Sequence, residues 1–561
     1  MTDPHLPHIS GEEAGIDDVT PGQRGNPESD SAADPDLEAV LDTALHEDRL
    51  ARAQAELMLV GPGLHAPTDR LSPRVVEESW GPEAREGLDD LRRDLSDQRL
   101  GLAISGGGAL GSFEAGVLRF VYDHLDIEPV AICGNSAGAL NAAKLAEGSR
   151  SDRPPIDEVE RIWRSLRVNA DMWEPEPWLV RLQASATWAS DLREQVGDPE
   201  GAANSVRVVM RVVSSLVRRP PETDGTIDAI RDALRAQSLL SLAPIAELVE
   251  RELDSDAIRR SGVELRVGTV SLEAGELRYV TGTGEVHDRA DQPMGLHPVD
   301  LAQAIVASAS IPVAFPPVPL NEEHYVDGGA REILPLELLV GQLGVTRVIA
   351  VSASSGGIRR APSFADRGLL DILRRVSAEI GPNETLRREL KPPGGWPEGV
   401  RLVIPEFDVH DAMTIDPALI AISIDHGYLR AADVLLDLGE EAAALTTDLT
   451  RVRIDLRHLA GPIPTLFGDA RSRTETPAPV DGDGPATHQV TDELDQQVSE
   501  ITPDPDPVDA AAAAAALTSR LRQLVLARQS LGAPLSPSLL AWLDEPDDRP
   551  DQAPAPLPAV D

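Results

Sequence analysis

The segment that decides the fold is residues 102–118, which read LAISGGGALGSFEAGVL. A short apolar run, typical of a buried strand, ends at Gly106, Gly107 and Gly108, and a helical pattern begins directly after them. Glycine allows the backbone to turn sharply and to expose its N–H groups, and at a helix N-terminus these donors lie at the positive end of the helix dipole. The sequence therefore predicts a turn that stabilises an anion.

Three anions fit such a turn: a pyrophosphate, a phosphate, and the oxyanion of an acyl-transfer intermediate. The spacing Gly106-x-Gly108-x-x-Gly111 satisfies the dinucleotide fingerprint. That fingerprint also needs an acidic residue at the end of the second strand, whereas Asp126 and Glu128 precede that strand. No Gly-Lys-Ser/Thr follows the turn as a P-loop requires. The residues therefore favour the oxyanion over the two nucleotide interpretations.

A second glycine turn follows the next predicted strand, residues 130–133, and precedes a predicted helix at residues 139–145. It reads Gly134-Asn-Ser-Ala-Gly138, which has the form Gly-x-Ser-x-Gly. Glycines on both sides allow a tight, strained turn that lifts the hydroxyl of Ser136 clear of the sheet, where it can attack a carbonyl. Two neighbouring strand ends would place this nucleophile beside backbone donors, as acyl transfer requires.

A serine hydroxyl needs a base to become a nucleophile. The sequence Tyr325-Val-Asp-Gly-Gly329 offers Asp327 at the end of a short apolar run, and the glycines behind it would leave room for a substrate. The alternative is that Asp327 only caps a turn.

Outside these turns, short apolar runs alternate with helical periods between Leu95 and about Thr447. The runs that predict strands are residues 99–105, 130–133, 263–270, 347–352 and 401–404. Strands separated by helices imply a parallel sheet covered on both faces. We therefore expect an α/β fold with three layers, α/β/α, around a mainly parallel central sheet.

Four blocks together resemble the patatin-like phospholipase family, over about Arg99 to Leu436. They are Gly106–Gly111, Gly134–Gly138, the segment ASASIPVAFP at residues 307–316, and Asp327–Gly329. In that family the serine of the second turn is the nucleophile, the aspartate is its partner in a dyad without histidine, and the glycine-rich turn forms the oxyanion hole.

The resemblance implies that Ser136 is the nucleophile and Asp327 the base, and that the N–H groups of Gly106, Gly107 and Gly108 are the oxyanion donors. The block at residues 307–316 would help to shape the acyl pocket. The glycines that complete the motifs are Gly111, Gly134, Gly138, Gly328 and Gly329. The implied function is hydrolysis of lipid acyl esters, of the phospholipase A or lysophospholipase kind.

Two residues depart from the family pattern. Many members have Arg or Lys where this chain has Leu110, so a cation that could position an anionic head group is missing. Asn135 stands before the nucleophile, where Thr is common, which changes a hydrogen bond behind the site rather than the chemistry.

Two other functions remain open. A Ser-Asp-His esterase would take its histidine from His410 or His426, which follow Asp327, while His324 is better explained as a loop or strand residue. A hydrolase fold can also persist as a non-catalytic scaffold or interaction protein.

The rest of the chain is organised around this domain. We expect a disordered acidic tail at 1–35, a helical extension at 36–94, the hydrolase domain at 95–450 with a helical insertion at about 151–236, an acidic linker at 468–508, an Ala-rich helix at 509–532 and a tail at 533–561. The insertion contains Trp163, Trp173, Trp178 and Trp188, and is either a lid or an ordinary layer of the core. The Ala-rich helix would dock on its own chain or on a protein partner.

Composition excludes several classes of function. The net charge of −43 argues against nucleic-acid binding, which needs a basic surface. No run approaches the roughly 18 apolar residues of a membrane span, and no apolar signal segment opens the chain, so we expect a cytoplasmic protein whose membrane contact is at most peripheral. The single cysteine, Cys133, and the absence of ligand spacing imply no metal and no other cofactor.

Overall fold

The computed structural model of this protein describes residues 71–178, 236–356, 375–461 and 507–544, with gaps at 127, 149–153, 393–394 and 397, and in addition residues 363–364, 372 and 463. The expected tail at 1–35, the first part of the helical extension, most of the acidic linker and residues 179–235 of the insertion lie outside the described residues.

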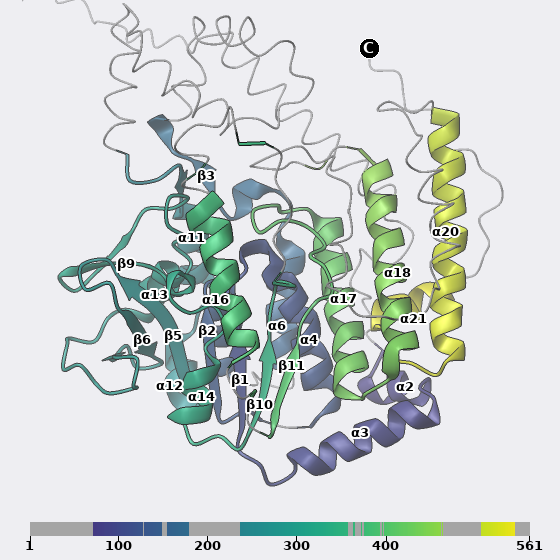
Figure 1. Ribbon diagram of the computed structural model, residues 1–561, viewed down its shortest axis with the longest axis horizontal. Coiled ribbons are helices and arrows are strands. Elements are labelled where there is room, and N and C mark those ends of the chain that lie inside the picture. Colours follow the sequence, from purple (N-terminus) through teal and green to yellow (C-terminus); the bar gives the residue numbers. More distant parts are fainter. Residues whose placement is uncertain are drawn as a thin grey trace, which may run out of the picture. The chain divides into compact units, whose positions relative to one another are not determined.

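A central sheet organises the domain (Figure 1). Among the described residues its main path is β11-β10-β1-β2-β5-β6-β7, with β9 paired to β5 and β8 paired to β9. The parallel strands are β1 (Leu100–Ile104), β2 (Ala131–Asn135), β5 (Glu264–Ser271), β10 (Arg347–Val351) and β11 (Val400–Val403). These correspond to the five strands predicted from the sequence, and the expected mainly parallel α/β fold is confirmed.

One end of the sheet is antiparallel, which the sequence did not predict. Its strands are β6 (Leu277–Thr281), β7 (Val286–His287), β8 (Val318–Leu320) and β9 (Glu323–Asp327). A separate short pair joins β3 (Glu174–Pro175) to β4 (Leu240–Ser241).

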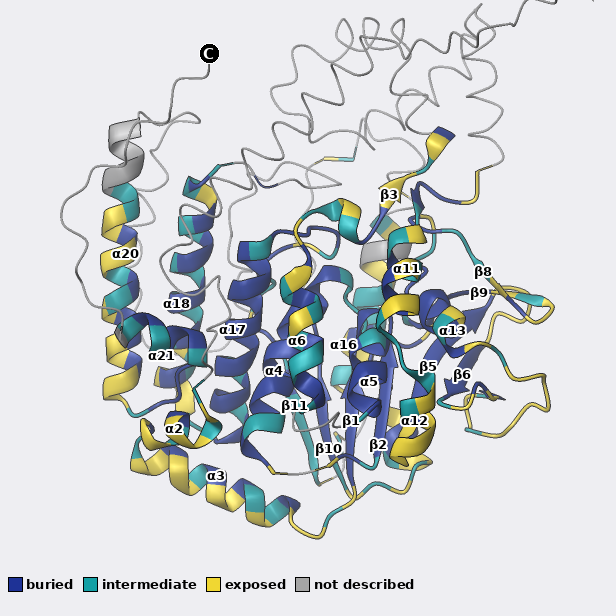
Figure 2. Ribbon diagram, turned by 180° about the vertical axis from the view of Figure 1, so that it is seen from behind, coloured by how far each residue is buried: buried dark blue, intermediate teal, exposed yellow. Residues whose placement is uncertain are grey.

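Helices cover both faces of the sheet because successive strand side chains point to opposite sides. Leu102 and Ile104 of β1 belong to the larger core, which contains α4 (Gly111–His124), α5 (Ala137–Ala146) and α17 (Pro417–Leu435). Ala103 belongs to a second core with α14 (Leu336–Gly341) and α16 (Gly381–Leu390). Figure 2 shows α4, α5 and α17 as mostly buried helices on their face of the sheet.

The remaining described helices surround these layers. They are α2 (Pro73–Glu78), α3 (Pro82–Leu95), α6 (Pro155–Ser165), α11 (Ala243–Glu252), α12 (Ser255–Ser261), α13 (Leu301–Ser308), α18 (Gly439–Leu459), α20 (Pro507–Ser530) and α21 (Pro537–Asp544), together with a π-helical turn at Arg375–Ile380. No helix in the described ranges has both the length and the apolar character needed to cross a membrane.

The helices α4 and α17 touch backbone to backbone. A Cβ on Gly116 would lie 1.9 Å from the carbonyl oxygen of Ile424, and a Cβ on Gly427 would lie 2.0 Å from that of Phe113. Only glycine fits at both positions, since such distances are far below van der Waals contact. This contact fixes α4, and α4 carries the glycine-rich turn at its N-terminus.

The first helix of the expected insertion, α6, belongs to the core. It packs on α4 and α5, and its Trp163 is buried. Trp173 and Trp178 are buried as well, whereas Trp188 lies outside the described residues. For residues 155–178 the structure therefore favours an ordinary layer of the domain over a lid.

The Ala-rich C-terminal helix packs on α18 of its own chain. Leu521, Leu524 and Val525 of α20 are buried in the larger core. The guanidinium of Arg528 is fully buried and donates hydrogen bonds to the carboxylate of Asp433 at 2.6 Å and to the carbonyls of Ala442 and Pro534 at 2.8 Å each. The apolar face that was expected to dock on this chain or on a partner is therefore covered by this chain.

The boundaries of the C-terminal segment differ from expectation at both ends. The helix α20 spans Pro507–Ser530, whereas the sequence predicted a helix at 509–532. Residues 537–544, expected in a tail, instead form α21, because Leu539 and Trp542 bury their side chains in the larger core.

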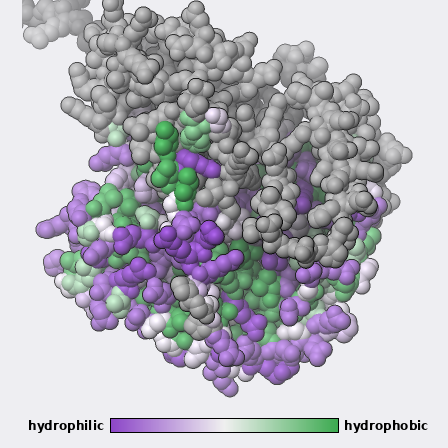
Figure 3. All heavy atoms as spheres, viewed as in Figure 1, coloured by the Kyte–Doolittle hydropathy of each residue, from purple (hydrophilic) through white to green (hydrophobic). Residues whose placement is uncertain are grey.

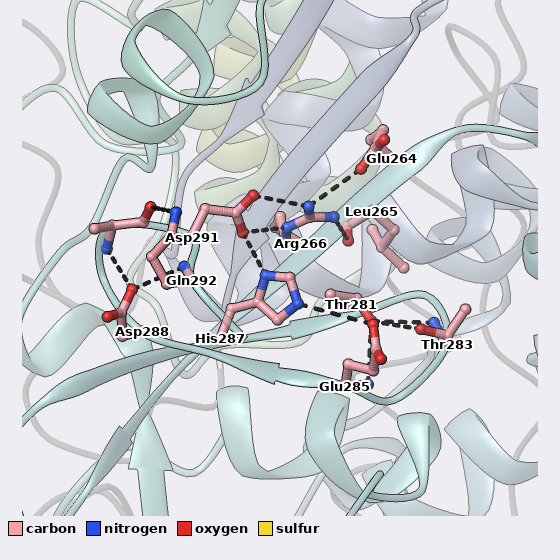
Figure 4. A network of polar contacts seen from close by, with 11 residues as sticks. Glu264, Leu265, Arg266, Thr281, Thr283, Glu285, His287, Asp288, Asp291 and Gln292 are labelled. Carbon is pink, nitrogen blue, oxygen red and sulfur yellow. Dashed lines mark hydrogen bonds and ion pairs between the residues drawn. The ribbon is translucent and has the colours of Figure 1, made fainter. Parts of the chain in front are cut away.

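A charged network ties the antiparallel end of the sheet to β5 (Figure 4). Arg266 of β5 donates to both carboxylate oxygens of Asp291, at 2.7 and 2.9 Å, and the same carboxylate bonds Nδ1 of His287 at 2.9 Å. Burial raises the pKa of Asp291, but Arg266 and His287 outweigh it and hold that pKa below its usual value. The turn after β7 is thus held to β5 by an ionised pair.

Candidate active site

Strand register explains how Ser136 and Asp327 meet. The strand β2 pairs with β5 as far as Asn135, opposite Gly268. The next residue of β5, Thr269, pairs with Asp327, the last residue of the antiparallel strand β9. Since β6 pairs with the other edge of β5, β9 continues on the edge that β2 has just left. The ends of β2 and β9 therefore meet at one point of the sheet.

The backbone at Ser136 is strained. Its φ of 53° and ψ of −128° lie in a region that residues other than glycine rarely adopt. The helix α5 begins at the next residue. A Cβ on Gly134 would lie 2.3 Å from the carbonyl oxygen of Gly138, and one on Gly138 would lie 2.2 Å from that of Ser105. The turn between strand and helix is therefore as tight as the sequence pattern predicted.

The Asp327 carboxylate is buried beside Ser136. Its Oδ1 accepts the N–H of Gly329 at 2.7 Å. Burial raises the pKa of Asp327 to about 6, although the neighbouring Ser136 side chain and the N–H of Gly329 act in the opposite direction. At neutral pH this group is an ionised carboxylate that is a stronger base than an exposed aspartate.

The ASASIP segment forms hydrogen bonds to the backbone of both Ser136 and Asp327. Ser308 Oγ accepts the backbone N–H of Ser136 at 2.9 Å and donates to the carbonyl of Gly268 at 2.7 Å. The carbonyl of Ser310 accepts the backbone N–H of Asp327 at 2.9 Å. The sequence indicated this segment as part of an acyl pocket, and the structure adds that it positions the two candidate catalytic residues.

The glycine-rich turn lies against Ser136, since a Cβ on Gly106 would be 3.0 Å from the Cβ of Ser136. The N–H of Gly106 already donates to the carbonyl of Ile333 at 3.1 Å. Within the described part of the chain, the N–H groups of Gly107 and Gly108 have no hydrogen-bond partner. Of the three expected oxyanion donors, the structure therefore leaves two unpaired.

A buried acid behind this turn had no signal in the sequence. The carboxyl of Glu114 accepts hydrogen bonds from Ser105 Oγ at 3.1 Å and from Asn141 Nδ2 at 2.9 Å. Complete burial raises the pKa of Glu114 well above its usual value, against the hydrogen bonds from Ser105 and Asn141. Glu114 connects the end of β1 to α4 and α5.

The three histidines considered as a third catalytic member lie elsewhere. His426 packs against the rings of Phe113 and Phe407, at centroid distances of 5.2 and 5.3 Å, and burial lowers its pKa to about 3. His410 is buried with its Nδ1 on a backbone carbonyl, and His324 pairs with a surface glutamate. In the described ranges no histidine hydrogen-bonds the candidate dyad.

An apolar hollow lies between α5, α6, α11 and α13. Leu140, on its wall, is one helical turn beyond Ser136 on α5, and Ile305 is about one turn before Ser308 on α13. Trp163 forms another part of the wall. The helix α5, which follows Ser136, therefore forms part of the wall, and the lining of the hollow is mainly apolar.

The fold is a three-layer α/β arrangement in which Ser136 lies on a tight turn between β2 and α5. Residues 102–340 match the family model of the patatin-like phospholipases, and they include both glycine turns, the ASASIP segment and Asp327. This part of the chain is thus a patatin-like phospholipase domain, as the resemblance of its motifs predicted.

Two solved structures are similar over most of the chain. VipD from Legionella pneumophila has 15% identity over 80% of this chain and 90% of its own, with a TM-score of 0.28. Human GIVD cytosolic phospholipase A2 has 9% identity over 70% of this chain and 69% of its own, with a TM-score of 0.29. No curated protein matches the sequence.

Proposed function

We propose that this protein is a serine acyl hydrolase that cleaves lipid acyl esters through a dyad of Ser136 and Asp327, with phospholipase A or lysophospholipase activity. The observation that carries the proposal is the strand register, which brings the ends of β2 and β9 together and sets the Ser136 side chain close enough to the buried Asp327 carboxylate to lower its pKa. A nucleophile on a strained turn thereby faces a base whose pKa burial raises to about 6.

The reaction proceeds in two steps. Asp327 accepts the proton of Ser136 as the serine oxygen attacks the acyl carbonyl, and the N–H groups of Gly107 and Gly108 stabilise the resulting oxyanion. Collapse of this intermediate breaks the ester bond, the leaving alcohol takes the proton from Asp327, and the acyl group stays on Ser136. Water, deprotonated by Asp327, then attacks the acyl-enzyme. Collapse of this second intermediate breaks the bond to Ser136, whose oxygen takes the proton back from Asp327, and the fatty acid is released.

The apolar hollow beside α5 supports an acyl substrate. Aliphatic walls at Leu140, Val159, Leu248 and Ile305 suit a hydrocarbon chain whose carbonyl is at Ser136. Leu110 is buried where many relatives have a cation, so this turn offers an anionic head group no positive side chain. Recognition then rests on the acyl chain, and octanoate esters are expected to be better substrates than acetate esters.

A fluorophosphonate probe, which reacts with activated serines, tests the assignment. The full-length protein is expected to be labelled at Ser136 and to hydrolyse p-nitrophenyl butyrate. Ser136→Ala should lose both properties, and Asp327→Asn should lose turnover, while both variants keep the unfolding temperature within a few degrees. Unchanged turnover in Ser136→Ala would refute the dyad, and loss of turnover in His410→Gln or His426→Gln would point to a triad.

A further inference from the structure

A short segment behind the site holds the two catalytic turns together. The carbonyl of Glu332 accepts a hydrogen bond from Asn135 Nδ2 at 2.7 Å, and Asn135 directly precedes Ser136. The carbonyl of Ile333 accepts the N–H of Gly106 at 3.1 Å, at the start of the glycine-rich turn. Residues 332–334 therefore position the nucleophile's turn on one side and the oxyanion turn on the other.

Glu389 of α16 holds residues 332–334 through hydrogen bonds to their backbone. Its two carboxylate oxygens accept the N–H of Ile333 at 3.1 and 3.2 Å, and one of them accepts the N–H of Leu334 at 2.9 Å. The helix α16 lies on the opposite face of the sheet from α4 (Figure 1), and its residues form part of the largely hydrophilic surface in Figure 3. A carboxylate on the outer layer is thus two hydrogen bonds away from Gly106.

The surroundings of Glu389 contain several ionisable groups. Burial, together with the nearby Glu332, raises the pKa of Glu389 to about 8. The two N–H donors and Arg289 act in the opposite direction. Burial also raises the pKa of Glu332 to about 7, against the hydrogen bond from Tyr279 and the charge of Arg289, and with Glu337 adding to the increase. Both carboxylates therefore change charge close to neutral pH.

We propose that Glu389 is a positioning residue for the oxyanion hole: it fixes residues 332–334, and through the carbonyl of Ile333 it fixes the glycine-rich turn that presents the N–H groups of Gly107 and Gly108. The ionised carboxylate accepts both N–H groups of the segment, whereas protonation removes part of this acceptor capacity. This role rests on the proposed function, because aligned donors matter only when an oxyanion forms.

The test compares Glu389→Ala and Glu389→Gln with Glu384→Gln, a matched variant on the same helix whose carboxylate pairs with Arg388 at the surface. With p-nitrophenyl butyrate, Glu389→Ala is expected to lower kcat about tenfold with KM within twofold, because the lost alignment acts on the transition state. Glu389→Gln keeps one oxygen acceptor and should recover part of kcat. Its kcat should also lack the change between pH 7 and 8.5 that the wild-type protein shows, whereas Glu384→Gln should match the wild type throughout.

A second readout does not depend on turnover. Amide hydrogen exchange of peptides that cover residues 104–112 and 332–334 should be faster in Glu389→Ala than in Glu384→Gln, under conditions where both are folded. Equal exchange, or equal kcat in an active protein, would overturn the positioning role. If the wild-type protein neither reacts with the fluorophosphonate nor cleaves esters, the proposed function fails, and the exchange measurement still decides whether Glu389 orders the turn.

Discussion

Ser308 and Ser136 are joined by a hydrogen bond in which Ser308 Oγ accepts the backbone N–H of Ser136 at 2.9 Å. The same hydroxyl donates to the carbonyl of Gly268 at 2.7 Å, so it ties the turn to β5. A residue with the backbone angles of Ser136 keeps them only when its surroundings impose them. Ser308 supplies one of these restraints from the end of α13.

Replacement of this hydroxyl should therefore affect catalysis and stability together. Ser308→Ala leaves a buried N–H and a buried carbonyl without their partner, which should lower the free energy of unfolding by about 1–3 kcal/mol. A displaced nucleophile should lower kcat for p-nitrophenyl butyrate by about tenfold or more. Gln303→Ala, at an exposed position of α13, is the control. Wild-type kinetics and unfolding in Ser308→Ala would show that Ser308 does not hold the turn.

In the glycine-rich turn, one substitution should impair activity and a second substitution should partly restore it. A Cβ on Gly107 would lie 2.5 Å from the Cβ of Ala353, so Gly107→Ala should push the turn away from Ser136. Loss of an oxyanion donor costs about 10²–10³ in kcat in other hydrolases. The double variant Gly107→Ala, Ala353→Gly removes the clash and should recover part of this loss.

The control for this pair is Gly341→Ala, at a glycine whose added Cβ meets no atom within 4 Å. Steady-state kinetics and thermal unfolding of the wild type and these three variants would separate catalysis from folding. A double variant no more active than Gly107→Ala would mean that the clash with Ala353 is not the cause.

The raised pKa of Asp327 predicts opposite effects of pH on activity and stability. The base must be ionised, so the main rise of kcat/KM with pH should lie near pH 6, and only the later step assigned to Glu389 should follow above pH 7. For stability the sign is reversed: the folded pKa exceeds the value of about 3.9 in an unfolded chain, so this group's contribution to stability is lost as pH rises from about 4 to 6.

Two measurements check this expectation. The pH profile of kcat/KM should have its acid limb near pH 6, and Asp327→Asn should be inactive at every pH and relatively more stable than the wild type above pH 6. An acid limb near pH 4 would contradict the effect of burial on this carboxyl.

The C-terminal ion pair should be sensitive to removal of one partner. The side chains of Arg528 and Asp433 are 0% and 1% exposed. Arg528→Met leaves a buried carboxylate uncompensated, which should cost about 3–5 kcal/mol in urea unfolding. Arg528→Met combined with Asp433→Leu should be closer to the wild type, and Gln529→Met, at an exposed position of α20, should be neutral. A smaller loss in the single variant than in the double would contradict this account.

The parallel half of the fold could be predicted because each of its strands is an apolar run between helical periods. The antiparallel half could not, since β7 is two residues long and β8 three, too short for a pattern of alternation. The ion pair of Arg266 and Asp291 depends on a turn at which Asp291 has a φ of 57°. Nothing local to either residue indicates that contact.

The residues of the candidate site also differ in how far the sequence alone predicts them. Ser136 and Asp327 stand out in the sequence because glycines flank them. Their proximity depends on β9 running back along β5, which no local pattern in the sequence indicates. Ser308 is visible only as one serine in a small-residue segment. Glu389 is one of two glutamates in the charged helix α16, and only the three-dimensional contact with residues 332–334 distinguishes it from Glu384.

The return of α20 across α18 has a consequence for how each copy of the protein is made. Translation reaches α18 well before α20, so the nascent chain exposes the apolar side of α18 and leaves Asp433 facing no guanidinium until residues near 528 leave the ribosome. Uncovered surface of this kind attracts chaperones and invites aggregation. Expression vectors should therefore keep residues 507–544 and attach any tag beyond them.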